Sequence, residues 1–233
     1  MKVLITGGSR GIGRACVELF AERGHEVIFL YRTSDEAACD LAARTGTMAI
    51  KCDVSLPCEV RAAMEKIGDV DVLVNNAGIS RFNFFDNISD EEWDSIIGTN
   101  LSGAFYVSRE AAKGMIANKR GRIINIGSMW GKTGAACEAH YSASKAGLRG
   151  MTMALAKELG PCNITVNCVE PGVIDTEMNS HLSDEEIEEL CTQTPLCRTG
   201  KACEVAELVC FLASDKAGFI TGQTIGIDGG FAI

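Results

Sequence analysis

A phenol and an ammonium group stand four residues apart in this chain, at Tyr141 and Lys145. Because an α-helix completes a turn in about 3.6 residues, this spacing places both side chains on one helical face. A free phenol titrates at about pH 10, and a fixed positive charge beside it stabilises the phenolate and lowers its pKa. We therefore predict that Tyr141 is the proton donor of an enzyme and that Lys145 lowers its pKa. A lone pair with this spacing is more often structural, so other motifs must support the interpretation.

A glycine-rich segment, T-G-G-S-R-G-I-G over residues 6–13, follows the first predicted strand and precedes a predicted helix. Where side chains are absent, a pyrophosphate can approach the backbone, and the N-terminus of the next helix attracts its negative charge. The strand-turn-helix context favours a dinucleotide site over a purely structural turn. The residues expected to contact the cofactor here are Gly7, Ser9, Arg10, Gly11, Ile12 and Gly13.

The charge at the end of the second predicted strand distinguishes NADPH from NADH. An NADH site places a carboxylate there to accept hydrogen bonds from the ribose, and a carboxylate repels the 2′-phosphate of NADPH. This strand ends in Tyr31-Arg32, and Arg10 supplies a second cation. Because guanidinium groups bind phosphate in a bidentate manner, the sequence favours NADPH/NADP+ as the cofactor. The alternative is that both arginines are ordinary surface residues and that Asp35 or Glu36 reaches the ribose.

Short segments rich in Val, Ile and Leu alternate with segments of helical length. This alternation favours right-handed βαβ crossovers, and strands that are apolar on both faces require a sheet covered on both sides. We predict one α/β domain over residues 1–233, a Rossmann-like, doubly wound parallel sheet of about seven strands with helices on both faces. The expected strands are Lys2–Thr6, Glu26–Tyr31, Thr47–Lys51, Asp71–Asn75, Arg122–Ile126, Ile164–Val169 and Thr224–Asp228.

Residues 176–200, after the sixth predicted strand, interrupt this alternation. The segment contains an acidic amphipathic stretch that begins with a capping-box pattern at Ser183 and Glu186. Insertions at the carboxyl ends of parallel strands lie where such folds bind ligands, so we predict a substrate lid. The alternative is a solvated surface excursion.

Composition narrows the classes of function. The 22 basic and 31 acidic residues give a net charge of -9, which opposes binding to nucleic acid or to an anionic membrane. No apolar run reaches the roughly 18 residues of a membrane span and no secretion signal is recognised, so we predict a cytoplasmic protein. The 11 cysteines contain no C-x-x-C pair and the 3 histidines lack the spacing of metal ligands, so we predict no metal site.

The T-G-x-x-x-G-x-G spacing resembles the short-chain dehydrogenase/reductase family, and further family motifs recur in order along nearly the whole chain. The N-N-A-G segment 75–78 follows the fourth strand, and Asp53-Val54 follows the third. The P-G-V-I-D-T segment 171–176 matches the nicotinamide loop of the family. The resemblance implies further cofactor contacts from Asp53, Val54, Asn75, Ala77, Gly78, Tyr141, Lys145, Pro171, Gly172, Ile174 and Thr176.

The catalytic set of the family can be matched residue by residue. Ser128 lies 13 positions before Tyr141, a separation typical of the family, and Asn100 lies in a T-N-L-S-G segment like that of the family's asparagine. The resemblance implies that Ser128 holds the carbonyl oxygen of the substrate and that Asn100 holds a water linked to Lys145. Tyr141 would then protonate the oxygen as hydride arrives from NADPH. The alternative is that Ser128 and Asn100 form only a turn and a helix cap.

Within the family, the chain most resembles 3-oxoacyl-[acyl-carrier-protein] reductases of fatty acid biosynthesis, so the expected substrate is a ketone of the 3-oxoacyl thioester type. Glu170 and Trp130 depart from the pattern of that group. An acidic carrier protein would need a basic docking patch, for which Lys119, Arg120 and Arg122 are candidates. The resemblance also implies a homotetramer.

Two alternatives remain open. The segments around Trp130 and Glu138 resemble bacterial elongation factor P aminopentanone reductases, whose ketone carries an amine. A buried ammonium needs a compensating carboxylate, and we expect Glu138 or Glu177 to provide it, with Glu170 as a third candidate and Trp130 as a wall of the pocket. The alternative from another class is a catalytically silent NADP(H)-binding sensor, against which the intact serine, tyrosine and lysine argue.

Overall fold

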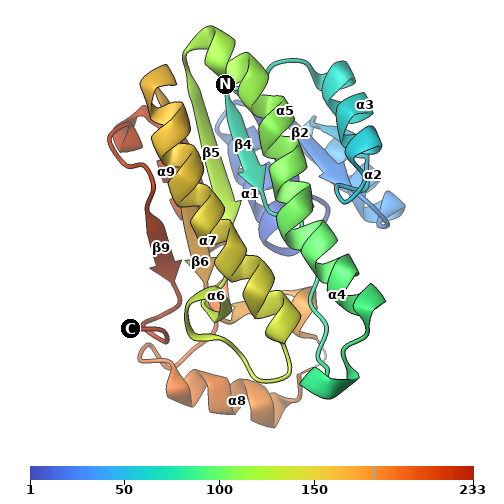
Figure 1. Ribbon diagram of the computed structural model, residues 1–233, viewed down its shortest axis with the longest axis vertical. Coiled ribbons are helices and arrows are strands. Elements are labelled where there is room, and N and C mark those ends of the chain that lie inside the picture. The colour runs from blue at the N-terminus through green and yellow to red at the C-terminus, as the bar shows by residue number, and fades with distance from the viewer. Residues whose placement is uncertain (181) are drawn as a thin grey trace.

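The computed structural model describes residues 1–180 and 182–233 and contains a seven-stranded sheet in which all neighbouring strands are parallel. The strand order is β3-β2-β1-β4-β5-β6-β9, so the direction of winding reverses between β1 and β4 (Figure 1). A ligand crevice is expected at the carboxyl ends of these two strands. The strands are β1 (Lys2–Thr6), β2 (Glu26–Tyr31), β3 (Met48–Lys51), β4 (Val72–Asn75), β5 (Gly121–Ile126), β6 (Ile164–Pro171) and β9 (Thr224–Ile227).

Helices cover both faces of the sheet (Figure 1). Those on one face are α1 (Gly11–Glu22), α2 (Asp35–Thr45) and α9 (Ala202–Ala213). Those on the other face are α3 (Pro57–Ile67), α5 (Gly103–Asn118) and α7 (Ala139–Leu159). Along β1, Val3 and Ile5 join the first core and Leu4 joins the second, because successive side chains of a strand point to opposite faces. The predicted doubly wound fold is confirmed.

A small second sheet was not predicted. β7 (Ile174–Asp175) pairs with β8 (Gly200–Lys201) in parallel. Strands of two residues carry no alternation of apolar and polar positions, so a sequence pattern cannot reveal them. The pairing joins the two ends of the predicted lid and makes residues 176–199 a loop closed at its base.

The predicted lid contains a short 3₁₀ turn (Glu177–Asn179) and the helix α8 (Asp184–Gln193). The predicted capping box is present, since the Glu186 N–H donates to Ser183 Oγ at 3.2 Å and the Ser183 N–H donates to Glu186 Oε2 at 2.8 Å. His181 lies outside the described residues. Figure 1 shows α8 at the end of the molecule toward which the strands of the sheet point.

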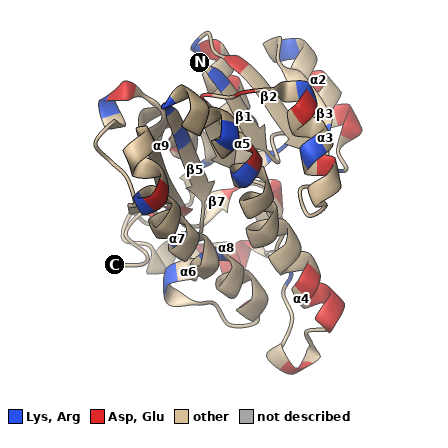
Figure 2. Cartoon of the chain, turned by 45° about the horizontal axis from the view of Figure 1, so that its top comes forward, with Lys and Arg blue, Asp and Glu red and all other residues tan. Residues whose placement is uncertain are grey.

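Two shorter helices lie on the side of α5 and α7. α4 (Asp90–Ile97) continues through a π-helical turn (Gly98–Ser102) into α5, and α6 (Trp130–Thr133) precedes α7. Further 3₁₀ turns are Phe85–Asn87, Gly160–Cys162 and Asp215–Ala217. Acidic side chains gather on α4 (Figure 2). Within the described part of the chain, none of the helices combines the length and the apolar character needed to cross a lipid bilayer.

Candidate active site

The glycine-rich turn is packed against the end of β4. Asn76 Nδ2 donates to the carbonyl oxygens of Thr6 and Gly7, each at 3.0 Å. A Cβ on Gly13 would lie 2.2 Å from the Gly7 oxygen and 2.4 Å from Asn76 Nδ2. Gly7 has a φ of +65°, a value that favours glycine. These contacts explain why glycines are needed here.

The first turn of α1 is open toward the crevice. Arg10 is its N-cap residue and makes no side-chain cap hydrogen bond, and the first turn contains no acidic residue. The backbone N–H groups and the positive end of the helix dipole are therefore available to an anion. This arrangement fits a pyrophosphate.

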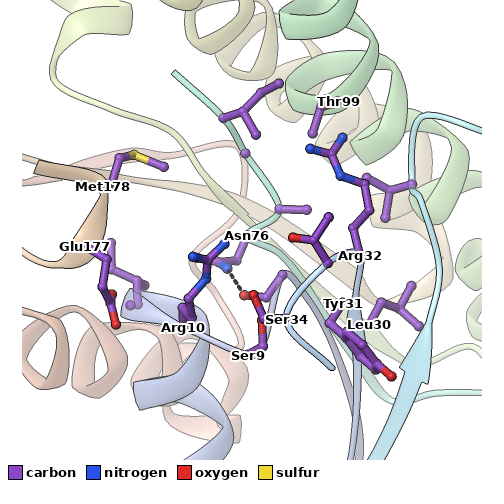
Figure 3. Close-up of a pocket in the computed structure, with 18 of the residues that line it drawn as sticks. Ser9, Arg10, Leu30, Tyr31, Arg32, Ser34, Asn76, Thr99, Glu177 and Met178 are labelled. Carbon is purple, nitrogen blue, oxygen red and sulfur yellow. Dashed lines mark hydrogen bonds between the residues drawn. The ribbon is translucent and has the colours of Figure 1, made fainter. Parts of the chain in front are cut away.

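A pocket of about 390 Å³ surrounds this turn (Figure 3). It brings together predicted cofactor residues from β1, β2, β3 and β4 and from the start of the lid: Gly7, Ser9, Arg10, Gly11, Ile12, Arg32, Asp53, Val54, Ala77, Gly78 and Thr176. Lining residues that the sequence analysis did not predict as cofactor contacts are Leu30, Tyr31, Thr33, Ser34, Cys52, Asn76, Ile79, Ser80, Thr99, Glu177 and Met178. Most of them are sequence neighbours of a predicted cofactor residue. The position of each strand end in the sequence could therefore have identified them.

Several predicted cofactor residues do not line this pocket: Gly13, Asn75, Tyr141, Lys145, Pro171, Gly172 and Ile174. Gly13 packs against the Gly7 backbone oxygen, on the side of the turn away from the pocket. Asn75 is the last residue of β4, and its amide donates inward to Ser108 Oγ and Asn125 Oδ1, both at 2.8 Å. Gly172 and Ile174 line a smaller hollow of about 80 Å³ instead. The sequence alone does not reveal which of the two adjacent asparagines, Asn75 or Asn76, directs its amide into the protein interior.

Two arginines lie at the pocket from different elements (Figure 3). Arg32 Nη1 lies 3.6 Å from Asp53 Oδ2, and its side chain remains 45% exposed. Asp35, the proposed alternative ribose ligand, instead accepts hydrogen bonds from Lys51 Nζ at 2.8 and 2.9 Å and is not among the lining residues. Arg10 and Arg32 thus line the pocket, whereas Asp35 does not.

The four catalytic candidates lie together at the end of β5, on α7 and on the π-helical turn. Ser128 lies close enough to Tyr141 for its hydroxyl to lower the pKa of the phenol, and Lys145 Nζ donates to the Ile126 backbone oxygen at 2.8 Å. Asn100 is 1% exposed. Its Oδ1 accepts from the Ile79 N–H at 2.8 Å, and its Nδ2 donates to the Ile79 oxygen at 2.9 Å.

Gly78 connects this group with the cofactor pocket. It lines the pocket, and a Cβ placed on it would lie 3.4 Å from Lys145 Nζ and 3.5 Å from Asn100 Oδ1. Asn100 Nδ2 also donates to Ser144 Oγ at 3.1 Å, and Ser144 Oγ donates to the backbone carbonyl oxygen of Tyr141 at 2.7 Å. The sequence analysis did not name Ser144, which fixes the π-helical turn to α7.

Burial dominates the titration of the catalytic pair. It raises the pKa of Tyr141 to about 12, although the hydrogen bond with Ser128 acts in the opposite direction and the Glu138 carboxylate adds to the rise. Burial also lowers the pKa of Lys145 to about 8. Burial therefore raises the pKa of Tyr141 in this structure, whereas the sequence predicts that Lys145 lowers it. The ammonium is directed to the Ile126 oxygen and lies 5.5 Å from the centre of the phenol ring.

The carboxylates considered for an amine-bearing substrate occupy different places. Glu138 is the N-cap residue of α7 and accepts a hydrogen bond from Ser80 Oγ. Glu177 lies at the glycine-rich turn, with its Oε2 3.9 Å from the position of a Cβ on Gly11. Glu170 is buried and pairs with Arg149. Of the three, only Glu138 raises the pKa of Tyr141 through its charge.

The candidate docking patch Lys119, Arg120 and Arg122 lies at the wrong end of the sheet. These residues surround the first residue of β5, whereas Ser128 follows its last residue. Arg120 and Arg122 also approach Asp215 Oδ1 at 3.8 and 3.5 Å. A carrier protein bound there would be separated from Tyr141 by the length of the strand, roughly 20 Å.

Within residues 1–180 and 182–233, no group of three or more His, Cys, Asp or Glu side chains is placed to hold a metal ion. Trp130 packs edge-on against Phe231, with the ring centres 5.4 Å apart.

Comparison with known proteins gives consistent results. The sequence model of a family described as enoyl-(acyl carrier protein) reductase matches residues 7–232. The chain is 44% identical over 233 residues to the 3-oxoacyl-[acyl-carrier-protein] reductase FabG of Escherichia coli (strain K12), covering 97% of this chain and 95% of that protein. The identity to the enzyme of the same name from Staphylococcus aureus (strain N315) is 43% over 236 residues, covering 97% and 96%.

A solved structure extends this likeness to three dimensions. The crystal structure of 3-oxoacyl-[acyl-carrier protein] reductase from Brucella melitensis superimposes with a TM-score of 0.94 at 35% identity. The superposition covers 100% of this chain and 91% of that chain.

Proposed function

Because the chain belongs to the short-chain dehydrogenase/reductase family, we propose that it reduces a 3-oxoacyl thioester to the corresponding secondary alcohol with NADPH. The observation that carries the proposal is the placement of Tyr141, Ser128 and Lys145 beside a pocket whose glycine-rich turn and open helix N-terminus suit a dinucleotide. The names of the relatives support an acyl-carrier-protein-bound substrate.

The pocket offers suitable partners for both charged groups of the cofactor, the pyrophosphate and the 2′-phosphate. The open N-terminus of α1 suits the pyrophosphate, and Arg10 and Arg32 suit the 2′-phosphate. Asp53 and Val54 would contact the adenine, and the segments 75–78 and 171–176 would hold the nicotinamide half. Bound NADPH supplies the hydride that reduces the ketone carbon.

The side chains of the interior supply the proton and the geometry. The Ser128 hydroxyl donates to the carbonyl oxygen of the substrate, and Tyr141 transfers its phenolic proton to that oxygen as negative charge develops there. A phenol with a raised pKa is protonated at neutral pH, which is the form that reduction requires. Lys145, with its pKa near 8, is suited to return a proton to the phenolate, and a water held at Asn100 would link Lys145 to solvent.

Further parts of the proposal concern the whole chain. We propose that residues 1–233 act as one domain, that residues 176–200 form a lid over the substrate, and that the protein is a cytoplasmic homotetramer. The closed base of the loop at β7 and β8 supports the lid, because it lets α8 move without disturbing the main sheet.

Oxidation of NADPH with a panel of ketones tests the function. The panel contains 3-oxoacyl thioesters on carrier protein and on a small thiol, a simple ketone, and an amino-ketone such as 5-aminopentanone linked to a lysine. We expect the highest kcat/KM with the 3-oxoacyl thioesters. Preference for the amino-ketone would indicate an elongation factor P aminopentanone reductase instead. Tight NADPH binding without turnover of any ketone would indicate a catalytically silent sensor.

A further inference from the structure

Glu170 is a buried carboxylate that the proposed reaction does not use. It lies near the end of β6 and is 3% exposed. A Cβ on the neighbouring Gly127 would lie 2.9 Å from Glu170 Cγ, so the side chain fills the space beside the end of β5. Its Oε1 lies 3.2 Å from Arg149 Nε without the alignment of a hydrogen bond. The carboxylate therefore forms an ion pair between β6 and α7.

This ion pair is not accounted for by its contribution to stability. Burial raises the pKa of Glu170, whereas Arg149 and Lys132 act in the opposite direction and Asp228 raises it further. A carboxyl group with a pKa raised by folding binds its proton more tightly in the folded state than in the unfolded state. At neutral pH its charge therefore subtracts from the free energy of unfolding.

One end of the ion pair lies within the backbone that supports the catalytic serine. The Gly127 N–H donates to the Val169 oxygen at 2.7 Å, and the Met129 N–H donates to the Pro171 oxygen at 3.0 Å. Glu170 is the residue between these two acceptors. A displacement of Glu170 therefore shifts both hydrogen bonds that flank the serine.

The other end of the ion pair lies on the helix that carries the proton donor. Arg149 follows Lys145 by four residues and Tyr141 by eight, so the three lie on one face of α7. The same helix packs closely on the turn after the serine, because a Cβ on Gly131 would lie 2.9 Å from the backbone carbon of Lys145. The pair thus joins α7 to the strand segment behind the serine.

We propose that Glu170 and Arg149 are positioning residues, whose ion pair fixes the separation between Ser128 and Tyr141. This inference rests on the proposed function for its kinetic effect. A misplacement of about 1 Å between catalytic groups can cost on the order of 10² in rate, so a modest electrostatic contact here has a large consequence.

The test compares Glu170→Gln, Arg149→Gln and the double variant in the holoenzyme. Glu170→Gln keeps the shape and removes the charge, and we expect kcat to fall at least about tenfold with KM and the Kd for NADPH within about twofold of wild type. Its Tm should equal or exceed that of wild type, because the buried charge is removed and Arg149 is 31% exposed to water. The double variant should lose no more activity than the worse single variant, since the two residues act as one unit.

Hydrogen exchange provides a readout that does not depend on turnover. In Glu170→Gln we expect faster exchange of the Gly127 and Met129 amides, with the Gly8 amide, which donates to the Leu30 oxygen at 3.0 Å, unchanged. Glu110→Gln is the matched control, because that carboxylate is also mostly buried and paired, with Lys113 on α5, and its side chain is 10% exposed. It should change neither kcat nor exchange at Gly127.

Two results would overturn the inference: a kcat of Glu170→Gln within twofold of wild type, or a loss of kcat accompanied by a lower Tm and faster exchange throughout the sheet. If wild-type protein reduces no ketone, the proposed function fails, and the exchange at Gly127 and Met129 still decides whether the pair positions the turn.

Discussion

The cofactor pocket and the catalytic interior differ in how their polar groups are held. At the pocket, the candidate cofactor contacts are backbone N–H groups and two arginines, of which Arg32 remains 45% exposed beside Asp53. In the interior, the four catalytic candidates are each 8% exposed or less, and side-chain hydrogen bonds connect the π-helical turn to α7.

This difference predicts which substitutions each region tolerates. Water can replace a lost partner at the pocket, so changes of charge there should alter affinity and preference rather than folding. In the interior, water cannot replace a lost hydrogen-bond partner. Each such loss leaves a buried polar group unsatisfied. Changes in the interior should therefore be larger and should affect catalysis and stability separately.

The sharpest contrast comes from Tyr141→Phe. The change removes the transferable proton from a buried site that water cannot fill, so we expect kcat to fall by about 10² to 10⁴ while the Kd for NADPH stays nearly constant. Tyr106→Phe on α5 is the control and should retain normal kcat. Near-normal turnover of Tyr141→Phe would show that another acid donates the proton and would remove the functional distinction between the regions.

Lys145 tests the electrostatic cost of the interior. Its pKa is lowered on folding from 10.5 to about 8, so the cost of burying its charge is present in full below about pH 8 and is relieved as pH rises toward 10.5. Between pH 8 and 10, the unfolding free energy of wild type should rise relative to that of Lys145→Met, toward a total on the order of 3 kcal/mol. Measurements should stop at pH 10, because Tyr141 begins to oppose this trend there. Parallel denaturation curves for the two proteins across this range would contradict the prediction.

Gly13→Ala tests the backbone-built region. The new Cβ would meet the Gly7 oxygen at 2.2 Å, so the turn must shift and cofactor binding should weaken by about 1–3 kcal/mol. Gly150→Ala on α7 is the matched control, because nothing lies within 4 Å of its Cβ position. Calorimetric titration with NADPH measures both, and equal affinities would mean that the turn is not the binding site.

Arg32→Asp should change preference more than total activity. Loss of a charged contact with the 2′-phosphate should lower the ratio of kcat/KM for NADPH over NADH about tenfold. Arg61→Asp on α3, an exposed position, controls for the change in net charge. A wild-type enzyme that prefers NADH would reject the cofactor assignment outright.

The smallest expected effect concerns Glu138. If the enzyme accepts an amino-ketone, Glu138→Gln should reduce its kcat/KM by about 1 kcal/mol and spare an uncharged 3-oxoacyl thioester. Glu177→Gln, which the sequence placed on an equal footing, should affect the cofactor instead, because its carboxylate lies at Gly11. Equal losses on both substrates would indicate structural damage.

The sequence predicted the sheet well because each of its seven strands is a short apolar segment next to a helix. It could not predict β7 and β8, which consist of two residues each. It placed the glycine turn and the tyrosine-lysine pair in the right neighbourhood, since these depend on local spacing. It did not anticipate the burial that raises the pKa of Tyr141 or the inward direction of the Asn75 amide. It also could not tell at which end of the sheet the patch at Lys119 lies.

The order of the strands also affects how the protein is made. The carbonyl oxygens that hold the turn at Ser128 belong to Val169 and Pro171, about 40 residues later. The strand β6 itself pairs with β9, which follows it by about a further 50 residues. During synthesis on a ribosome, the cofactor-binding half can pair its strands while the catalytic turn still lacks its support. The active centre is therefore completed only after β6 and β9 have emerged, and a nascent chain stalled before β6 cannot be an active enzyme.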